Sequence, residues 1–329
     1  MKYFQHYNAE SVTDAVSLLQ QSNGKGKLIA GGTDLIGTLK DDILPQYPEA
    51  VINIKSIPGL DFIEADGNDI VIGALTKLAN IVQSSVVKEN FPLLADAAES
   101  VASPEIRNMG TLGGNLCQET RCWYYRYPDS MGGRIQCFRK GKGPCPAIKG
   151  DNRYHAIFGA KKCFAVCPSD MAVALAALDA GLTIAGFDGE KNMPLMDFYK
   201  PLGCALKPNE LLTSVRIPSA FRQIPQRFIK FRVRESVDFA VASVAMAVTP
   251  SAEGVCKDAR IVLGGVAPTP HRAIEAEKAI IGSSLTAATA ETAAQSAVMG
   301  AKPLRRNAYK VQIVKALIKR ALMEIAGSF

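Results

Sequence analysis

The spacing of apolar residues changes along the chain, and each change predicts a different set of elements. In the first stretch, apolar positions recur at helical spacing over residues 12–21, and Ser11 is placed to cap that helix. Short apolar runs at 27–30 and 51–54 predict strands. We therefore expect a small α/β unit at residues 1–57.

A Pro-Gly turn at residues 58–59 opens the second stretch, which we expect to extend over residues 58–220. Its pattern predicts a hairpin, several helices and a further strand. The hairpin strands are expected at 62–64 and 70–72, the helices at 78–87, 93–101 and 170–180, and the last strand at 182–185. Residues 117–167 have little periodicity and are rich in glycine, proline and basic residues, so we expect them to form an insert.

The third stretch, residues 221–329, has its strands first and its helices afterwards, which is typical of an α+β domain. The strands are expected at 227–233, 240–248 and 259–264, and the helices at 271–281, 287–298 and 309–326. A chain of 329 residues exceeds what one core usually fills, so two or three domains are expected on length alone.

The composition fits an ordinary globular protein, with 48% hydrophobic and 21% charged residues. No window of about 20 apolar residues lacks a charge, and the N-terminus has no signal-peptide apolar core. We therefore expect a cytoplasmic protein with no membrane span.

Six of the eight cysteines lie within the insert, and so does the positive charge. Residues 121–163 contain ten Lys or Arg and two Asp, a local charge of +8 against +7 for the whole chain. Iron–sulfur clusters held by thiolates are anions, so this charge favours a cluster and an acidic redox partner. Nucleic acid is disfavoured, because the charge follows no helix face and no nucleic-acid motif is present.

Two glycine loops, at residues 30–35 and 110–115, are candidates for nucleotide binding. Paired glycines let backbone N–H groups approach a phosphate without a Cβ in the way. Neither loop has the Gly-x-Gly-x-x-Gly or Walker pattern, and for either one taken alone a tight turn is the commoner interpretation. Together, they would clamp one dinucleotide between two α/β units.

Several motifs in order along the chain make it resemble the FAD-binding medium subunit of the molybdenum hydroxylase (xanthine oxidase) family. They are Leu28-Ile29-Ala30-Gly31-Gly32-Thr33-Asp34-Leu35, Arg107-Asn108-Met109-Gly110-Thr111-Leu112-Gly113-Gly114-Asn115, Pro168-Ser169-Asp170, Lys230-Phe231-Arg232, Asp238-Phe239-Ala240 and residues 263–268 with Arg272. The resemblance implies an α+β fold. Two FAD-binding subdomains of the vanillyl-alcohol oxidase/p-cresol methylhydroxylase type would precede a C-terminal α+β domain.

The resemblance also implies non-covalent FAD and a set of contact residues. The first loop would wrap the pyrophosphate and the second would lie opposite, with Asp170 on a polar part of the cofactor and Lys230 near the flavin. The residues implied are Ile29, Ala30, Gly31, Gly32, Thr33, Asp34, Leu35, Ile36, Val101, Thr111, Leu112, Gly113, Gly114, Asn115, Asp170, Leu212 and Lys230. Two alternatives stay open, namely that Asp170 is only a helix cap and that Lys230 is only a surface strand residue.

The insert resembles that of a subset of the family, the β subunit of 4-hydroxybenzoyl-CoA reductase and the flavin subunit of aromatic aldehyde oxidoreductases. By that resemblance, Cys122, Cys137, Cys145 and Cys163 would bind a [4Fe–4S] cluster, with Cys167 as an alternative fourth ligand. Their gaps of 14, 7 and 17 residues leave zinc open as well. Cys117 is expected near the flavin loop, Trp123, Tyr124 and Tyr125 around the cluster, and Cys204 and Cys256 as isolated buried thiols.

The function implied is that of an electron-transfer subunit of a molybdenum-dependent oxidoreductase, with no catalytic residue of its own. Its expected partners are a molybdopterin-containing large subunit and a [2Fe–2S] small subunit, in a dimer of heterotrimers, and a ferredoxin-like carrier. We expect a reductase of the 4-hydroxybenzoyl-CoA type, with an aldehyde or N-heterocycle oxidoreductase as the alternative. A stand-alone FAD oxidase with a structural metal staple is a further alternative.

Overall fold

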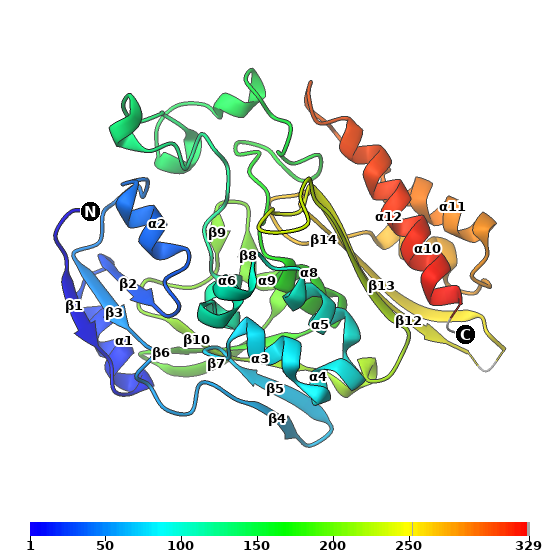
Figure 1. Cartoon of the computed structure of the whole chain (residues 1–329), viewed down its shortest axis with the longest axis horizontal. Helices are drawn as coiled ribbons and strands as arrows, with labels where there is room; N and C mark the ends of the chain where they lie inside the picture. The colour runs from blue at the N-terminus through cyan, green and yellow to red at the C-terminus, as the bar shows by residue number, and fades with distance from the viewer. Residues whose placement is uncertain (252, 328–329) are drawn as a thin grey trace.

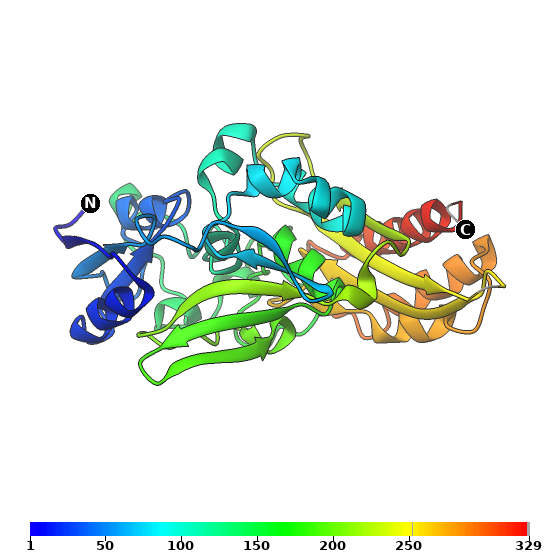
Figure 2. The same ribbon diagram turned by 90° about the horizontal axis from the view of Figure 1, so that it is seen from below.

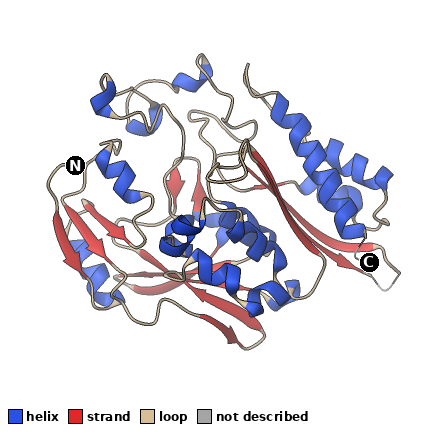
Figure 3. Ribbon diagram, viewed as in Figure 1, coloured by secondary structure: helices blue, strands red, loops and turns tan. Residues whose placement is uncertain are grey.

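The structure is a computed structural model that describes residues 1–251 and 253–327. Its strands form three main sheets, one in each of the stretches distinguished by the sequence pattern (Figure 1, Figure 3). The first sheet and the C-terminal helices lie at opposite ends of the molecule (Figure 2). Separate domains with boundaries at residues 57 and 220 remain a prediction.

The first sheet is parallel, in the order β1 (Gln5–Asn8), β3 (Ala50–Asn53), β2 (Gly26–Ile29). Helix α1 (Val12–Gln21) has the predicted bounds, and the Ser11 side chain accepts a hydrogen bond from Asp14 N at 3.0 Å, as a cap does. The sequence pattern did not predict β1 or the short helix α2 (Leu35–Lys40).

The second sheet is antiparallel and joins the predicted hairpin to strands from much later in the chain. Its order is β4 (Ile63–Asp66), β5 (Asp69–Gly73), β10 (Leu211–Ile217), β6 (Gly181–Gly186) and β7 (Gly189–Pro194). A small ribbon of β8 (Tyr199–Lys200) and β9 (Gly203–Cys204) follows α9 (Leu195–Phe198). We did not predict β7 or β10.

Six helices accompany this sheet. They are α3 (Leu78–Gln83), α4 (Ser85–Asn90), α5 (Pro92–Glu99), α6 (Pro104–Met109), α7 (Leu112–Leu116) and α8 (Asp170–Ala177). The single helix predicted at 78–87 is wrong, because Ser84 is extended and its side chain caps α4 by accepting from Val87 N. All of α8 is buried, and it packs against α5 and against the third sheet.

The third sheet runs in the order β11 (Gln226–Phe231), β12 (Ala242–Pro250), β13 (Cys256–Gly264), β14 (His271–Arg272). Helices α10 (Ile274–Ile280), α11 (Ala287–Ala297) and α12 (Tyr309–Ala326) pack together at its end of the molecule (Figure 1). The helix predicted at 271–281 therefore starts too early, because His271 and Arg272 pair with β13.

The insert has almost no regular structure, as expected, and forms the long green loop at the top of Figure 1. Its elements are three single turns of 3₁₀ helix at Asp129–Met131, Phe138–Lys140 and Pro146–Ile148; a fourth such turn, Ser219–Phe221, lies outside it. Among the described residues, no helix is long and apolar enough to cross a membrane.

Candidate cofactor sites

The two glycine loops lie against each other, backbone to backbone. A Cβ on Gly31 would lie 2.7 Å from the carbonyl carbon of Met109 and would overlap its oxygen. Gly32 adopts a positive φ of 72°, which favours glycine. In the part of the chain that the structure describes, the N–H groups of Gly31, Gly32 and Thr33 donate no hydrogen bond. The first loop therefore presents free backbone donors, as an anion-binding loop requires.

The second loop differs, because the protein itself uses its backbone donors. Leu112 N donates to Thr76 O and Gly113 N donates to Ala74 O, each at 2.8 Å. Gly114 N donates to the Thr111 side chain at 3.1 Å, which caps α7. We infer that this loop packs against the first one and supports it. Its backbone N–H groups are already used within the protein, so it would contact a ligand through side chains and not through free amides.

Asn115 fixes the second loop to α8. The Ser169 hydroxyl donates to Asn115 Oδ1 at 2.6 Å and accepts from Ala172 N at 3.0 Å. Ser169 is therefore the cap of α8, so Asp170 is not placed there merely as a helix cap.

Asp170 and Lys230 form a buried ion pair, with Nζ 2.7 Å from Oδ2. The Lys230 side chain is only 4% exposed and also donates to Ser100 O, so the alternative of a surface strand residue is wrong. Burial raises the pKa of Asp170, and the Lys230 ammonium opposes that rise. The pair leaves a fixed dipole beside a cavity that Asp170 lines.

That cavity has a volume of about 360 Å³ and lies between the insert, the start of α8 and the loop after β11. The insert lines it with the aromatic side chains of Trp123 and Tyr154. The loop after β11 lines it with Arg234, Asp238 and Phe239. The lining residues of the cavity include Cys122, Trp123, His155, Ala165, Cys167, Asp170, Asp238 and Phe239. Two further implied contacts lie outside the glycine loops. Leu212 is buried in the core, and the Val101 carbonyl accepts a hydrogen bond from the Arg107 guanidinium at 2.9 Å.

Asp34 is engaged within the protein. Its carboxylate lies 2.9 Å from Arg121 and 2.6 Å from Arg126, and it accepts from Glu119 N at 2.8 Å. These three partners belong to the start of the insert. Asp34 thus fastens the insert to the first glycine loop.

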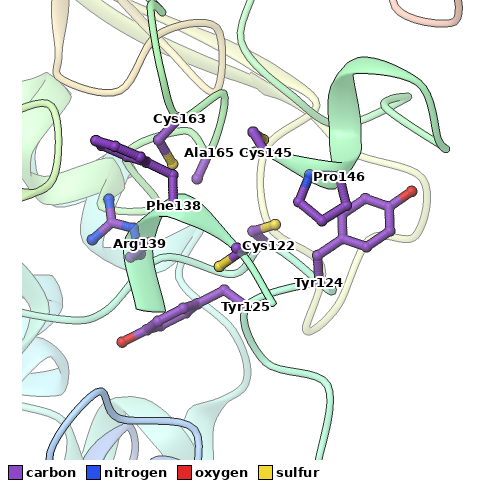
Figure 4. A pocket seen from close by; sticks show the side chains of 10 residues that line it. Cys122, Tyr124, Tyr125, Phe138, Arg139, Cys145, Pro146, Cys163 and Ala165 are labelled. Carbon is purple, nitrogen blue, oxygen red and sulfur yellow. The ribbon is translucent and has the colours of Figure 1, made fainter. Parts of the chain in front are cut away.

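The four cysteines named by the resemblance line one small cavity, although three long gaps separate them in sequence. Figure 4 shows Cys122, Cys145 and Cys163 around the same space, with Tyr125 and Arg139 at one side. Cys122 and Ala165 line both this cavity and the larger one that holds Asp170. The two candidate sites are therefore neighbours.

The environment of these thiols favours the neutral form until a cation binds. Burial raises the pKa of Cys122 to about 11, the charges of Cys163 and Cys145 add to that rise, and the N–H groups of Tyr125 and Tyr124 oppose it. Burial likewise raises the pKa of Cys145. Metal binding here must displace protons, as it does at thiolate sites generally.

The arrangement does not match a site for one metal ion. Among the described residues, no group of three or more His, Cys, Asp or Glu side chains converges on one point. A zinc ion needs such convergence, whereas an iron–sulfur cluster spreads its irons over separate thiolates. Four thiols around a common space are the donor set that an iron–sulfur cluster takes.

The remaining insert cysteines lie elsewhere. Cys167 is buried near Ser169 and lines only the larger cavity of the two, and burial raises its pKa to about 12. Cys117 is exposed at the end of α7, and its thiol lowers the pKa of the Cys204 thiol. Describing Cys204 as an isolated buried thiol is therefore wrong, whereas Cys256 is buried as expected.

The sequence pattern did not single out His155. Its Nε2 lies 3.3 Å from Cys122 Sγ, and the residue is buried. Burial, reinforced by the Lys310 charge, lowers the pKa of His155 to about 4. Only its position inside the insert, next to Tyr154, could have drawn attention to it.

Four arginines of the insert are engaged within the protein: Arg121 and Arg126 bind Asp34, Arg134 donates to Leu44 O, and Arg139 pairs with Glu119 at 3.7 Å. Arg153 is exposed and pairs with Asp151 at 2.8 Å. Lys140 is buried, whereas Lys142, Lys149, Lys161 and Lys162 are exposed. Only part of the +8 charge is therefore available to a partner.

Comparison with known families agrees with this arrangement. Residues 2–220 match the family described as the FAD binding domain in molybdopterin dehydrogenase, and residues 227–325 match the CO dehydrogenase flavoprotein C-terminal domain. The expected α+β fold, with an FAD-binding part and a C-terminal domain, is thereby confirmed.

Individual relatives match over almost their whole length. The chain is 33% identical to the aldehyde oxidoreductase FAD-binding subunit PaoB of Escherichia coli (strain K12) over 98% of both chains. It is 28% identical to the carbon monoxide dehydrogenase medium chain of Hydrogenophaga pseudoflava, covering 97% of this chain and 96% of that one. A solved structure of carbon monoxide dehydrogenase from that organism aligns with a TM-score of 0.78 at 27% identity, covering 99% of this chain and 98% of the other. The chain belongs to the FAD-binding medium subunits of the molybdenum hydroxylase family, a family of oxidoreductases.

Proposed function

We propose that this chain is the FAD- and [4Fe–4S]-carrying electron-transfer subunit of a molybdenum-dependent dehydrogenase that oxidises an aldehyde or an N-heterocycle. The relative at 33% identity is an aldehyde oxidoreductase subunit, which supports this alternative over the reductase of an aromatic thioester that we had expected. The organic substrate would react in a partner subunit, and electrons would leave through this chain.

The first glycine loop would hold the FAD pyrophosphate with its free N–H groups, and Asp170 and Lys230 would face the polar part of the cofactor. Bound FAD supplies uptake of two electrons together and their release singly. This chain's residues would orient the cofactor and exclude water from it. The cavity beside Asp170 is the space we assign to the part of the cofactor that Asp170 and Lys230 face.

One observation supports the cluster most directly: four thiols from a segment without regular structure line one cavity, next to the cavity that Asp170 lines. Tyr125 and Phe138 enclose the thiols, and the N–H groups of Tyr124 and Tyr125 point at the Cys122 sulfur. Enclosure and N–H groups of this kind stabilise an anionic cluster. Cys122, Cys137, Cys145 and Cys163 are the ligands we propose.

The proposed partners are a molybdopterin-containing large subunit and a [2Fe–2S] small subunit, assembled as a dimer of heterotrimers. An acidic ferredoxin-like carrier would dock on the exposed lysines near Cys145 and Cys163. Charge reversal of Lys142, Lys149 and Lys161 should slow reduction of the carrier, with the largest effect at low salt. Reversal of Lys55, Lys88 and Lys257, which are also exposed, should not.

The test is cofactor analysis of anaerobically purified protein. We expect one FAD and about four irons per chain. Cys137→Ser should lose the iron and keep FAD, whereas Cys256→Ser, which changes a buried thiol of the third sheet, should keep both. Wild-type protein without iron would refute the cluster, and loss of both cofactors in the Cys137 variant would refute two separate sites.

A further inference from the structure

His155 is a buried polar side chain that lines the cavity beside Asp170 and that the function proposed above leaves without a role. It is 3% exposed, and its ring centroid lies 6.1 Å from that of Trp123 and 6.0 Å from that of Tyr124. Buried polar groups are nearly always hydrogen-bonded. The partner of Nε2 is the sulfur of Cys122, at 3.3 Å.

The chemistry of a cluster ligand decides which atom donates in this contact. A cysteine binds iron as a thiolate, which has no proton to give, so with a cluster in place Nε2–H is the donor to Cys122. Nδ1, which has no hydrogen-bond partner among the described residues, is then an unprotonated nitrogen and not an orphaned buried N–H group.

The backbone of His155 is held in place from two sides. Its N–H donates to Asn152 O at 3.0 Å, and its carbonyl accepts from Asn307 Nδ2 at 3.0 Å. Both asparagines are buried, and Asn152 Oδ1 in turn accepts from Arg306 N at 2.9 Å. The segment just before α12 thus fixes the position of a ring inside the insert.

We propose that His155 raises the reduction potential of the cluster by donating an Nε2–H hydrogen bond to Cys122, as a positioning residue and not as a ligand. This rests on the function proposed above. Reduction adds negative charge that spreads onto the cysteine sulfurs, and an N–H aimed at one of them stabilises the reduced form. Cys122 also lines the cavity beside Asp170, so the tuned sulfur is on the side that faces the proposed FAD.

The experiment compares H155F and H155Q in the full-length protein, with the midpoint potential followed by EPR during a redox titration. H155F should keep its iron and FAD, and its potential should shift to a more negative value. H155Q retains an N–H donor and should recover most of that shift. The matched control is H271F, whose ring stacks on Phe158 at 4.2 Å, and it should leave the potential unchanged. An unshifted potential in H155F would overturn the proposal.

A second measurement covers the case in which H155F fails to assemble the cluster. Wild-type protein labelled with ¹⁵N-histidine should give one weak nitrogen coupling to the reduced cluster in pulsed EPR, and H155Q should lack it. No coupling, or the strong coupling of a direct ligand, would refute the tuning role. Wild-type protein without iron would instead refute the proposed function, so the two failures are distinguishable.

Discussion

The paired glycine loops and the cysteine pocket differ in the part of the chain that builds them. The loops act through backbone, with free N–H groups on the first loop and a second loop packed so closely that no Cβ fits on Gly31. The pocket is made of side chains from a segment that is nearly all loop. We therefore expect a glycine-to-alanine change, which adds a methyl group, to disrupt the loops. We expect a cysteine-to-serine change, which removes a sulfur, to disrupt the pocket.

The two regions are also joined. Asp34 belongs to the first loop, and Arg121 and Arg126 belong to the insert, so one carboxylate ties the regions together. A variant that loses FAD but keeps iron, or the reverse, would show that the glycine loops and the cysteine pocket act separately. Substitution of Asp34 tests whether its ion pairs couple the two regions.

The largest effect is expected from Gly31→Ala. The new methyl group would overlap the Met109 carbonyl, and both groups are backbone or attached directly to it, so the loops must separate. We expect loss of FAD binding with the iron retained, measured as FAD and iron per chain. Gly37→Ala is the control, since nothing lies within 4 Å of its Cβ position. Retention of FAD by Gly31→Ala would contradict the close packing of the loops.

A comparison of Cys163→Ser with Cys167→Ser tests the pocket. Cys163 lines the cavity with the other three cysteines, and Cys167 does not. We expect Cys163→Ser to lose the iron and the broad visible absorption of the cluster, and Cys167→Ser to keep both. If Cys167→Ser lost the iron and Cys163→Ser kept it, the fourth ligand would be Cys167.

Asp34→Asn tests the connection between the regions. The change leaves two partly buried guanidinium groups without their anion, which we expect to cost about 2 kcal/mol. FAD should bind more weakly, and the insert should become more accessible to protease, as seen by limited proteolysis. Arg216→Gln removes an exposed ion pair instead and should change neither property.

Lys310 should make stability depend on pH. It is fully buried in α12, its ammonium donates to Gly265 O, and burial lowers its pKa to about 7. Between pH 7 and about 10, the unfolded chain holds a proton that the native protein has lost, so the free energy of unfolding rises with pH by at most about 1.4 kcal/mol per unit.

Lys310→Met should remove this rise, measured by chemical denaturation at several pH values. Lys319→Met, a change on the same helix at a surface ion pair, should leave the rise intact. Parallel pH profiles for wild type and Lys310→Met would show that Lys310 keeps its ordinary pKa.

Sequence patterns predicted the elements whose determinants are local. The bounds of α1 and α12 follow from apolar spacing, and Ser11 and Ser169 cap their helices through hydrogen bonds to residues three positions away. The break at Ser84 was missed because the apolar spacing continues across it. The strand β10 was missed because its partners β5 and β6 are distant in sequence.

The sequence by itself determined the residue types: two glycine loops, a set of cysteines in a basic insert, and membership of a flavoprotein family. Only the tertiary structure decided that Asp34 binds the insert, that Cys163 rather than Cys167 joins the other three thiols, and that His155 contacts Cys122. The reason is separation along the chain. Asp34 bonds to Glu119 across 85 residues, and His155 is held by Asn307 across 152. Contacts over such distances depend on how sheets and loops pack together, and no local periodicity records them.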